Sequence, residues 1–283
     1  MTSRVAPAFI WACRAELDAP KPGNVHVFAA GHRMTADEFV ASADAAAPSL
    51  SAEGTRVGAR ILGAVEATSA AIGANTNLGI ILLCAPLAAA ADAEGTDLRA
   101  SLVKVLHDLD TEDADLAFRA IVRAAPAGIG HSARHDVFKP ATVSLLQAMT
   151  EAANRDRVAR QYATNFADVF DLGLPLLEAA TRQHANPKWA TLTTYLGFLS
   201  AFPDSHILRK HDAQTADEVQ RTAATFQASL RAEHPAQLLP KLLAWDAALK
   251  AHGVNPGTSA DLTVATLFAK RLQIILPSER NGG

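Results

Sequence analysis

Three polar segments, rich in proline, glycine and ionisable side chains, interrupt a chain that is otherwise dominated by apolar helical patterns. We call them the first, second and third polar segments; they cover residues 20–25, 202–212 and 255–261. Proline lacks an amide proton and crowds the preceding turn, so a helix must break in each segment. Helix N-termini present free amide groups to anions, which makes such breaks candidates for phosphate chemistry.

The first polar segment, Pro20-Lys21-Pro22-Gly23-Asn24-Val25, holds one lysine between two prolines on a rigid extended backbone. Gly23 allows the backbone to turn, or allows a ligand to approach it closely. The preceding residues 9–17 have a helical pattern, which brings Glu16 to the helix end beside Lys21. The alternative is a stiff connector whose lysine faces water.

The second polar segment concentrates ionisable side chains between two predicted helices. Its chemistry-bearing residues are Asp204, His206, Arg209, Lys210, His211 and Asp212. Carboxylates, imidazoles and cations in so short a stretch can bind phosphates and transfer protons. A solvated loop can have the same composition, and this alternative stays open.

The third polar segment runs into an apolar helical stretch. Gly257, Thr258 and Ser259 would offer amide and hydroxyl groups to a phosphate or a metal-bound phosphate at the helix N-terminus. Thr258-x-x-Asp261 also matches a capping box, which is the structural alternative. The chain has no Gly-x-x-x-x-Gly-Lys pattern, so this is not a P-loop of the usual kind.

A further polar stretch, Asn75-Thr76-Asn77, precedes the most apolar predicted helix, residues 78–91. A helix that is apolar on all sides is expected to be central, and its N-terminus is a natural anion site. Capping of the helix by Asn75 or Thr76 is the alternative. The acidic residues between 108 and 115 could hold Mg²⁺, or could be the carboxylates favoured at the start of a helix.

We predict an all-α fold: a single globular domain over residues 1–283, built of about ten or more helices. Alanine-rich stretches with helical period follow one another, and strand patterns are nearly absent. Capping-box patterns at residues 35–38 and 215–218 predict helix starts. Pro48 is expected to end the first of these helices. The predicted helices cover residues 9–17, 35–47, 52–72, 78–91, 97–109, 112–124, 141–154, 155–162, 166–182, 188–201, 215–232 and 236–252.

Composition narrows the class of protein. The chain has 49% hydrophobic and 19% charged residues, which is ordinary for a large globular core, and its net charge of −3 argues against a nucleic-acid binder. The longest apolar run, residues 78–91, is too short to span a membrane, and no signal peptide is evident. We therefore expect a cytoplasmic protein without a membrane partner. An apolar helical surface could also support a homodimer.

Taken together, these segments resemble the triphosphoribosyl-dephospho-CoA synthase family over nearly the whole chain. The first and third polar segments are the most specific matches. The matching residues are Glu16 with the first polar segment, His32 with Met34 and Phe39, Asn75-Thr76 with Gly79, Asp204 with Arg209, and Pro256 to Leu262. The resemblance implies an all-helical enzyme that joins ATP, as substrate, to 3′-dephospho-CoA and releases adenine.

The reaction implied by the resemblance passes through an oxocarbenium-like transition state, which needs a proton acceptor, a proton donor and cations for the triphosphate. The hypothesis is that Glu16 is the base and that His32 or His206 is the acid; exchanging Glu16 with Asp261 fits equally well. Asp204 and Asp261 would hold Mg²⁺. The residues assigned to the nucleotide phosphates and their surroundings are Lys21, Gly23, Asn24, Asn75, Thr76, Asn77, Arg209, Lys210, Gly257, Thr258 and Ser259.

The chain departs from the founding enzymes at three places. It has Asn77-Leu78 where they have His-Lys, Arg33 where they have Asp, and Arg209-Lys210-His211 where they have Arg-Gly-Gly. This pattern resembles the branch found in methanogens and methylotrophs, which is associated with one-carbon carriers of the methanopterin and methanofuran types. Three functions therefore stand side by side: the founding transfer to a phosphorylated acceptor, another enzyme of one-carbon cofactor synthesis, and a non-catalytic nucleotide-binding protein.

Overall fold

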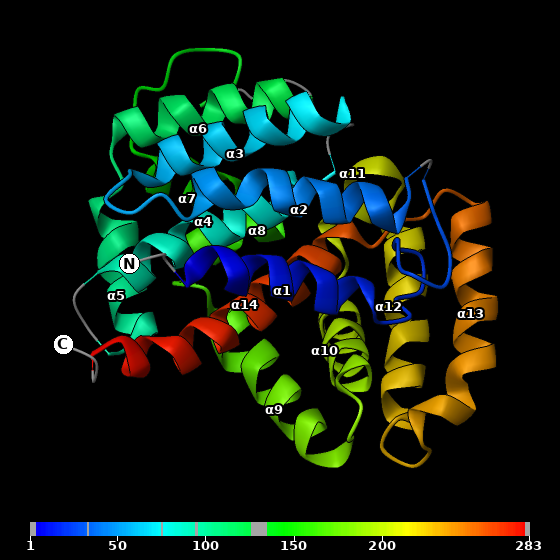
Figure 1. Ribbon diagram of the computed structural model, residues 1–283. Coiled ribbons are helices and arrows are strands. Elements are labelled where there is room, and N and C mark those ends of the chain that lie inside the picture. The colour runs from blue at the N-terminus through cyan, green and yellow to red at the C-terminus, as the bar shows by residue number, and fades with distance from the viewer. Residues whose placement is uncertain (1–3, 33, 75, 94–95, 126–134, 281–283) are drawn as a thin grey trace. The chain divides into compact units, whose positions relative to one another are not determined.

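Every regular element in the described part of the chain is a helix, and this confirms the all-α prediction. The computed structural model describes residues 4–32, 34–74, 76–93, 96–125 and 135–280. Figure 1 shows the helices in chain order. They are α1 (Val5–Leu17), α2 (Ala36–Leu50), α3 (Val57–Ile72), α4 (Leu78–Asp92), α5 (Leu98–Asp108), α6 (Thr111–Ala124), α7 (Leu145–Ala152), α8 (Arg157–Ala163), the π-helix η1 (Asp168–Gly173), α9 (Leu174–Gln183), α10 (Pro187–Ala201), α11 (Ser205–Lys210), α12 (Ala213–Ser229), α13 (Pro235–Ala251) and α14 (Gly257–Arg280).

The chain divides into two compact units, and three of the four boundaries between them fall inside helices α1, α2 and α14. The first unit contains residues 1–12, 38–167 and 268–283, and the second contains residues 13–37 and 168–267. Each unit is assembled from segments that are far apart in the sequence. All three polar segments belong to the second unit, whereas Thr76 and Asn77 belong to the first.

Helix α4 is the buried centre of the first unit, as its apolar sequence predicts. It packs against α3, α5 and α8. Pro86 lies inside α4, and a proline there cannot donate a hydrogen bond to the carbonyl of residue 82. The hydroxyl of Tyr162, in α8, donates to that Leu82 carbonyl at 2.6 Å. A side chain from a neighbouring helix thus replaces the hydrogen bond that proline removes.

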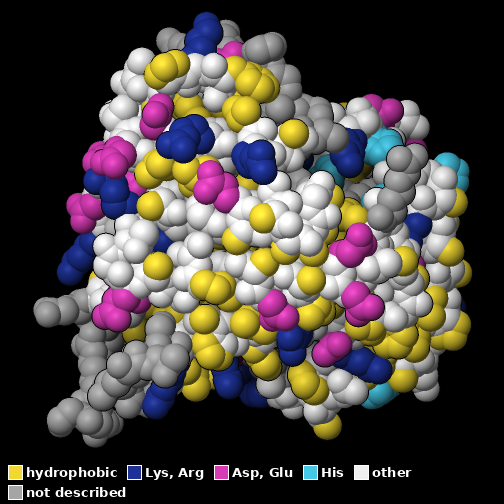
Figure 2. All heavy atoms as spheres, turned by 45° about the horizontal axis from the view of Figure 1, so that its top comes forward, with side chains coloured by type: hydrophobic (Ala, Val, Ile, Leu, Met, Phe, Trp, Pro, Cys, Tyr) yellow, Lys and Arg dark blue, Asp and Glu magenta, His cyan; other side chains and the backbone are white. Residues whose placement is uncertain are grey.

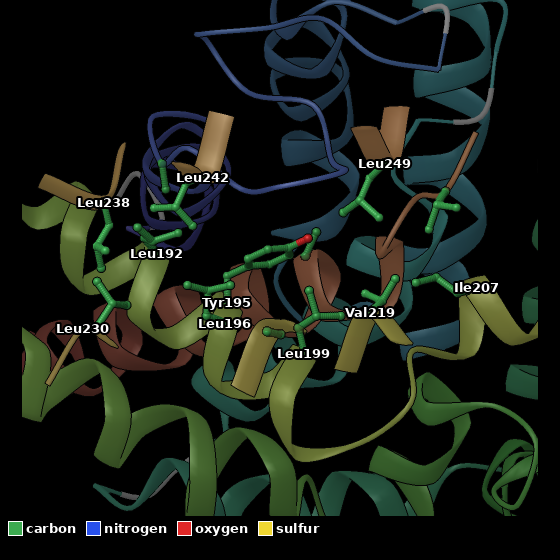
Figure 3. Close-up of a cluster of buried hydrophobic side chains, with 14 of the residues drawn as sticks. Leu192, Tyr195, Leu196, Leu199, Ile207, Val219, Leu230, Leu238, Leu242 and Leu249 are labelled. Carbon is green, nitrogen blue, oxygen red and sulfur yellow. The ribbon is translucent and has the colours of Figure 1, made fainter. Parts of the chain in front are cut away.

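Helix α10 has the corresponding place in the second unit. Its side chains are buried nearly all round, and it packs against α9 and α12. Figure 3 shows the leucine-rich cluster that α10 forms with residues of α11, α12 and α13. Phe226 of α12 and Trp245 of α13 stack at 5.2 Å between ring centroids, which ties these two helices together. This leucine-rich cluster holds in place the helix ends that adjoin the polar segments.

Several predicted boundaries were wrong. Pro48 does not end α2, which continues to Leu50. Helix α3 begins at Val57 rather than at residue 52, because the chain turns through Gly54 with a φ of +67°. The second polar segment, predicted as a loop, contains the short helix α11. Helix α12 begins at Ala213, where the Asp212 side chain caps it, rather than at the predicted Thr215 box.

The acidic residues before α6 have a structural role. Asp110 caps α6 and forms a capping box with Asp113. Arg56 makes ion pairs with both of these carboxylates and with Glu112. The helix dipole favours carboxylates at the start of a helix, and Arg56 balances their negative charge.

Candidate functional site

Lys21 of the first polar segment is fully buried and pairs with Glu16 at the end of α1. Its ammonium group lies 2.5 Å from Glu16 Oε1, and it donates to the Val25 carbonyl at 2.6 Å and to Asn24 Oδ1 at 3.1 Å. Burial raises the pKa of Glu16 and lowers that of Lys21, and the attraction between them opposes both shifts. The predicted neighbourhood of Glu16 and Lys21 is present, but all three donors of Lys21 are taken. A phosphate contact through Lys21 would require the pair to open.

The rest of the first polar segment is fastened to α10, α13 and the third polar segment. Tyr195 of α10 donates to the Pro22 carbonyl at 2.7 Å, and Asn24 Nδ2 donates to Asn255 Oδ1 at 2.8 Å. Gly23 has a φ of +82°, and a Cβ atom there would lie 2.7 Å from Pro256 Cδ. Only glycine satisfies both the backbone and the space at this position. The segment therefore holds α14's first turn in place.

One carboxylate joins the second and third polar segments. Asp204 Oδ1 accepts from the amides of His206 and Ile207 at the start of α11. Asp204 Oδ2 accepts from both the amide and the hydroxyl of Ser259 in α14, each at 2.8 Å. Burial raises the pKa of Asp204, and these four hydrogen bonds oppose the rise. Asp204 and Ser259, which the sequence hypothesis assigned to Mg²⁺ and to phosphate, instead bind each other.

Five side chains near this junction form what we call the basic cluster: His32, His206, Arg209, Lys210 and His211. The His206 ring packs on the first residue of α14, since a Cβ atom on Gly257 would lie 2.2 Å from its Nδ1. His32 Nε2 donates to the Gly23 carbonyl at 2.8 Å, and His32 itself has a φ of +55°. A non-glycine residue in that conformation is held there by its surroundings. Figure 2 shows histidine side chains together with lysine and arginine on one face of the molecule.

The electrostatics of the basic cluster favour a bound anion. Burial, together with the nearby charges of Lys210 and Arg209, lowers the pKa of His206 to about 3. Burial also lowers the pKa of His32, and the charge of Lys210 contributes to this shift. The pKa of Lys210 is itself lowered by burial and by the charge of Arg209. Crowded positive charge of this kind is relieved when an anion binds. Gly257 and the buried Thr258 add the N-terminus of a 24-residue helix to the cluster.

The predicted Mg²⁺ ligands do not fit a metal site in this geometry. Both oxygens of Asp204 accept two hydrogen bonds each, so its lone pairs are used. Asp261 is half-buried in the first turns of α14. Among the residues that the structure describes, no group of three or more His, Cys, Asp or Glu side chains could hold a metal ion.

The predicted residues of the first unit are occupied by local contacts. Asn75 lies outside the described residues. Thr76 Oγ1 lies 2.5 Å from Ser42 Oγ, and the buried Asn77 side chain donates to the Ser42 carbonyl and to Thr68. A hollow of about 800 Å³ in this unit lies between α3, α6 and residues 137–140. It contains none of the predicted site residues.

The sequence reasoning missed Asp246, Lys250 and His26. Asp246 and Lys250 are one helical turn apart in α13 and form an ion pair at 2.9 Å. Asp246 Oδ1 accepts from the Gly23 amide at 2.8 Å. The available signal was a single acid and a lysine at i, i+4 in the apolar stretch Leu-Leu-Ala-Trp-Asp-Ala-Ala-Leu-Lys, which also fits an ordinary surface pair.

The comparisons with known proteins confirm the family resemblance that the sequence suggested. The family model of the ATP:dephospho-CoA triphosphoribosyl transferases, CitG, matches residues 2–279. The chain belongs to this family. As a CitG-family transferase, it has the helical fold of a crystal structure from Archaeoglobus fulgidus, that of a candidate triphosphoribosyl-dephospho-CoA synthase. That match has a TM-score of 0.62 and 24% identity, and it covers 82% of this chain and 97% of the other.

A search of curated proteins found no match to this transferase. Within the described residues, no helix is long and apolar enough to cross a bilayer.

Proposed function

We propose that the chain transfers the triphosphoribosyl group of ATP to 3′-dephospho-CoA and releases adenine. A ribose hydroxyl of the acceptor forms a bond to C1′ of ATP's ribose while the bond from C1′ to adenine breaks. The hydroxyl loses its proton and the departing adenine gains one, so atoms and charge balance. The site must therefore hold a triphosphate, accept one proton and supply another.

The basic cluster is the observation that carries this proposal. Arg209 and Lys210 are exposed on α11 and would contact the phosphates, together with the amide of Thr258. Burial lowers the pKa of His206, and the charges of Lys210 and Arg209 add to this effect; an anion there would offset these charges. A triphosphate is the part of ATP that offers such an anion, and helix N-termini bind phosphates in this way.

The burial of the candidate residues indicates which of them accepts and which donates a proton in the proposed transfer. Glu16 is buried and paired with Lys21, so it supports the fold of the first polar segment in our proposal. Asp261, half-buried in α14, is then the candidate base that takes the hydroxyl proton. His206 is neutral at pH 7 without ligand, because burial lowers its pKa to about 3. His206 or His32 would become an acid only after a bound triphosphate raises the pKa.

Another enzyme of one-carbon carrier synthesis is the second candidate. The lysine that the founding enzymes have after Asn-Thr is Leu78 here, and Leu78 is buried as the first residue of α4. The loss of that cation favours a phosphorylated acceptor other than 3′-dephospho-CoA, of the kind found in the methanopterin and methanofuran branch.

The decisive test measures adenine by mass spectrometry after incubation with ATP and Mg²⁺, with and without 3′-dephospho-CoA. Adenine that appears only with the acceptor supports the proposal. Lys210→Met should lower kcat/KM for ATP about tenfold, the cost of one charge-assisted contact of about 1.4 kcal/mol. Lys241→Met, which removes an exposed lysine of α13, is the matched control and should leave turnover unchanged.

The other outcomes separate the candidates. ATP binding by calorimetry without adenine release would favour the one-carbon enzyme, and pathway intermediates would then be screened as acceptors. Saturable ATP binding without turnover of any acceptor would favour a non-catalytic nucleotide-binding protein. Absence of ATP binding to the wild-type chain would contradict both transfer from ATP and nucleotide binding.

A further inference from the structure

Asp246 is buried in α13 and contacts Lys250 in the same helix and Gly23 and His26 in the segment that follows α1. Its Oδ1 accepts from the Gly23 amide at 2.8 Å, and its Oδ2 accepts from Lys250 Nζ at 2.9 Å. The same Oδ2 lies 3.4 Å from His26 Nε2. Burial acts to raise the pKa of Asp246, but His26, Lys250 and the Gly23 amide outweigh it and leave the pKa below its usual value. Asp246 is therefore an anion in the folded protein.

Lys250 connects Asp246 to the loop that carries His32. Its ammonium group also donates to the Ala29 carbonyl at 3.0 Å. Its side chain passes under Gly31, where an added Cβ atom would lie 2.8 Å from Lys250 Cε. His32 follows directly, in its left-handed conformation, with its ring bonded to the Gly23 carbonyl. Both fixed points of His32, the loop and Gly23, thus depend on Asp246.

His26 makes the arrangement costly. It is fully buried, its Nε2 has only the long 3.4 Å contact with Asp246, and its Nδ1 has no hydrogen-bond partner among the described residues. Burial lowers its pKa, and Asp246 opposes that shift. A buried polar group without a partner costs about 1–3 kcal/mol, so the position is poor for stability alone. Local arrangements that break a stability rule are expected where a site must be positioned.

We propose that Asp246 is a positioning residue for the candidate site. It fixes Gly23 and, through Lys250, the loop that presents His32. It also supplies negative charge beside a site that is otherwise cationic. The proposal rests on the proposed function, because it assigns Asp246 to the same site.

The test is Asp246→Asn, which keeps the side-chain shape and an acceptor for the Gly23 amide but removes the charge. His32 faces Lys210 of α11, Lys250 and Asp246 of α13, and the His206 ring. Since the charge of Asp246 raises the pKa of His32, its loss should lower that pKa, followed by NMR titration of the imidazole. The kcat for adenine release should fall about tenfold, in the range that misplacement of a reacting group can cause. ATP affinity should be unchanged or tighter, because a negative charge near the phosphates is gone.

Asp217→Asn, which removes an exposed carboxylate on α12 in the same unit, is the matched control. An unchanged His32 pKa, or turnover equal to that of the control, would overturn the proposal. A fall in kcat together with weaker ATP binding would assign Asp246 to structure alone. Should Asp246→Asn fail to fold by circular dichroism, Lys250→Met tests the same link: turnover should fall, and the pKa of His32 should rise because a cation is removed. If the wild type releases no adenine, the proposed function fails, while the His32 titration still decides whether Asp246 organises this loop.

Discussion

Asp204 caps two helices at once, because Ser259, 55 residues later in the chain, gives it both an amide and a hydroxyl hydrogen bond. The other carboxylate oxygen caps α11 through the amides of His206 and Ile207. The two helix N-termini that flank the basic cluster therefore share one negative charge. Because Asp204 accepts from the amides of His206, Ile207 and Ser259, these amides are not available to a ligand phosphate at this junction.

Asp204→Ala should destabilise the protein strongly. Four donors that are now paired would lose their acceptor, and each orphaned buried donor costs about 1–3 kcal/mol. We expect the free energy of unfolding to fall by about 3 kcal/mol or more, as measured in urea. Asp212→Ala is the control, since Asp212 caps only α12 and is exposed; its loss should cost about 1 kcal/mol. Equal losses for the two variants would show that the bond to Ser259 contributes nothing.

Gly23→Ala should cost more than Gly253→Ala. Both glycines have positive φ angles, of +82° and +69°, so an alanine at either position pays about 1–2 kcal/mol of backbone strain. A Cβ atom at Gly253 meets nothing within 4 Å, whereas one at Gly23 overlaps Pro256 and Leu249. Overpacking adds about 1–3 kcal/mol. Thermal unfolding of the two variants measures the difference, and similar melting temperatures would contradict this contact.

The pair of Glu16 and Lys21 should behave as a unit. Removing one partner leaves a buried charge and should cost about 3–5 kcal/mol, whereas the double variant Glu16→Gln, Lys21→Met should lose much less than the sum. ATP affinity of the double variant decides between two roles for Lys21. An ATP affinity equal to that of the wild type would show that Lys21 has only a structural role. A large loss of ATP affinity would support the predicted contact between Lys21 and a phosphate.

The helical fold could be predicted because its signals are local. The apolar run that became α4 and the capping residues before α5 and α6 act within a few residues. Pro48 and the Thr215 box misled the prediction because α2 continues two residues beyond Pro48, and because Asp212 rather than Thr215 caps α12.

The site could be predicted only in part, because its contacts join distant segments. Asp204 meets Ser259, and Gly23 meets Asp246, across more than fifty and more than two hundred residues. The types of residue in the polar segments were visible in the sequence. Which of them bond to each other, as Lys21 does to Glu16, depends on burial that no local pattern specifies.

His206 should make the protein less stable in acid. Its ordinary pKa is 6.5, and burial lowers this to about 3 in the folded state. Between pH 6.5 and 3 the unfolded chain binds a proton that the folded chain does not, so stability falls as pH falls through this window. Urea unfolding at pH 7.5 and pH 5 should show a smaller acid loss in His206→Asn than in the wild type. His252→Asn, at an exposed position, should behave as the wild type does.

Bound ATP should raise the pKa of His206 back toward its ordinary value. A bound triphosphate adds negative charge beside His206, Lys210 and Arg209, and opposite charge favours the protonated imidazole. The pKa of His206 should therefore rise on addition of ATP in an NMR titration, and ATP should bind more tightly at pH 5.5 than at pH 7.5. The two effects are linked, since a ligand that raises a pKa must bind the protonated form better. The pH dependence of affinity should shrink in His206→Asn. ATP binding that leaves the His206 titration unmoved would place the phosphates away from α11.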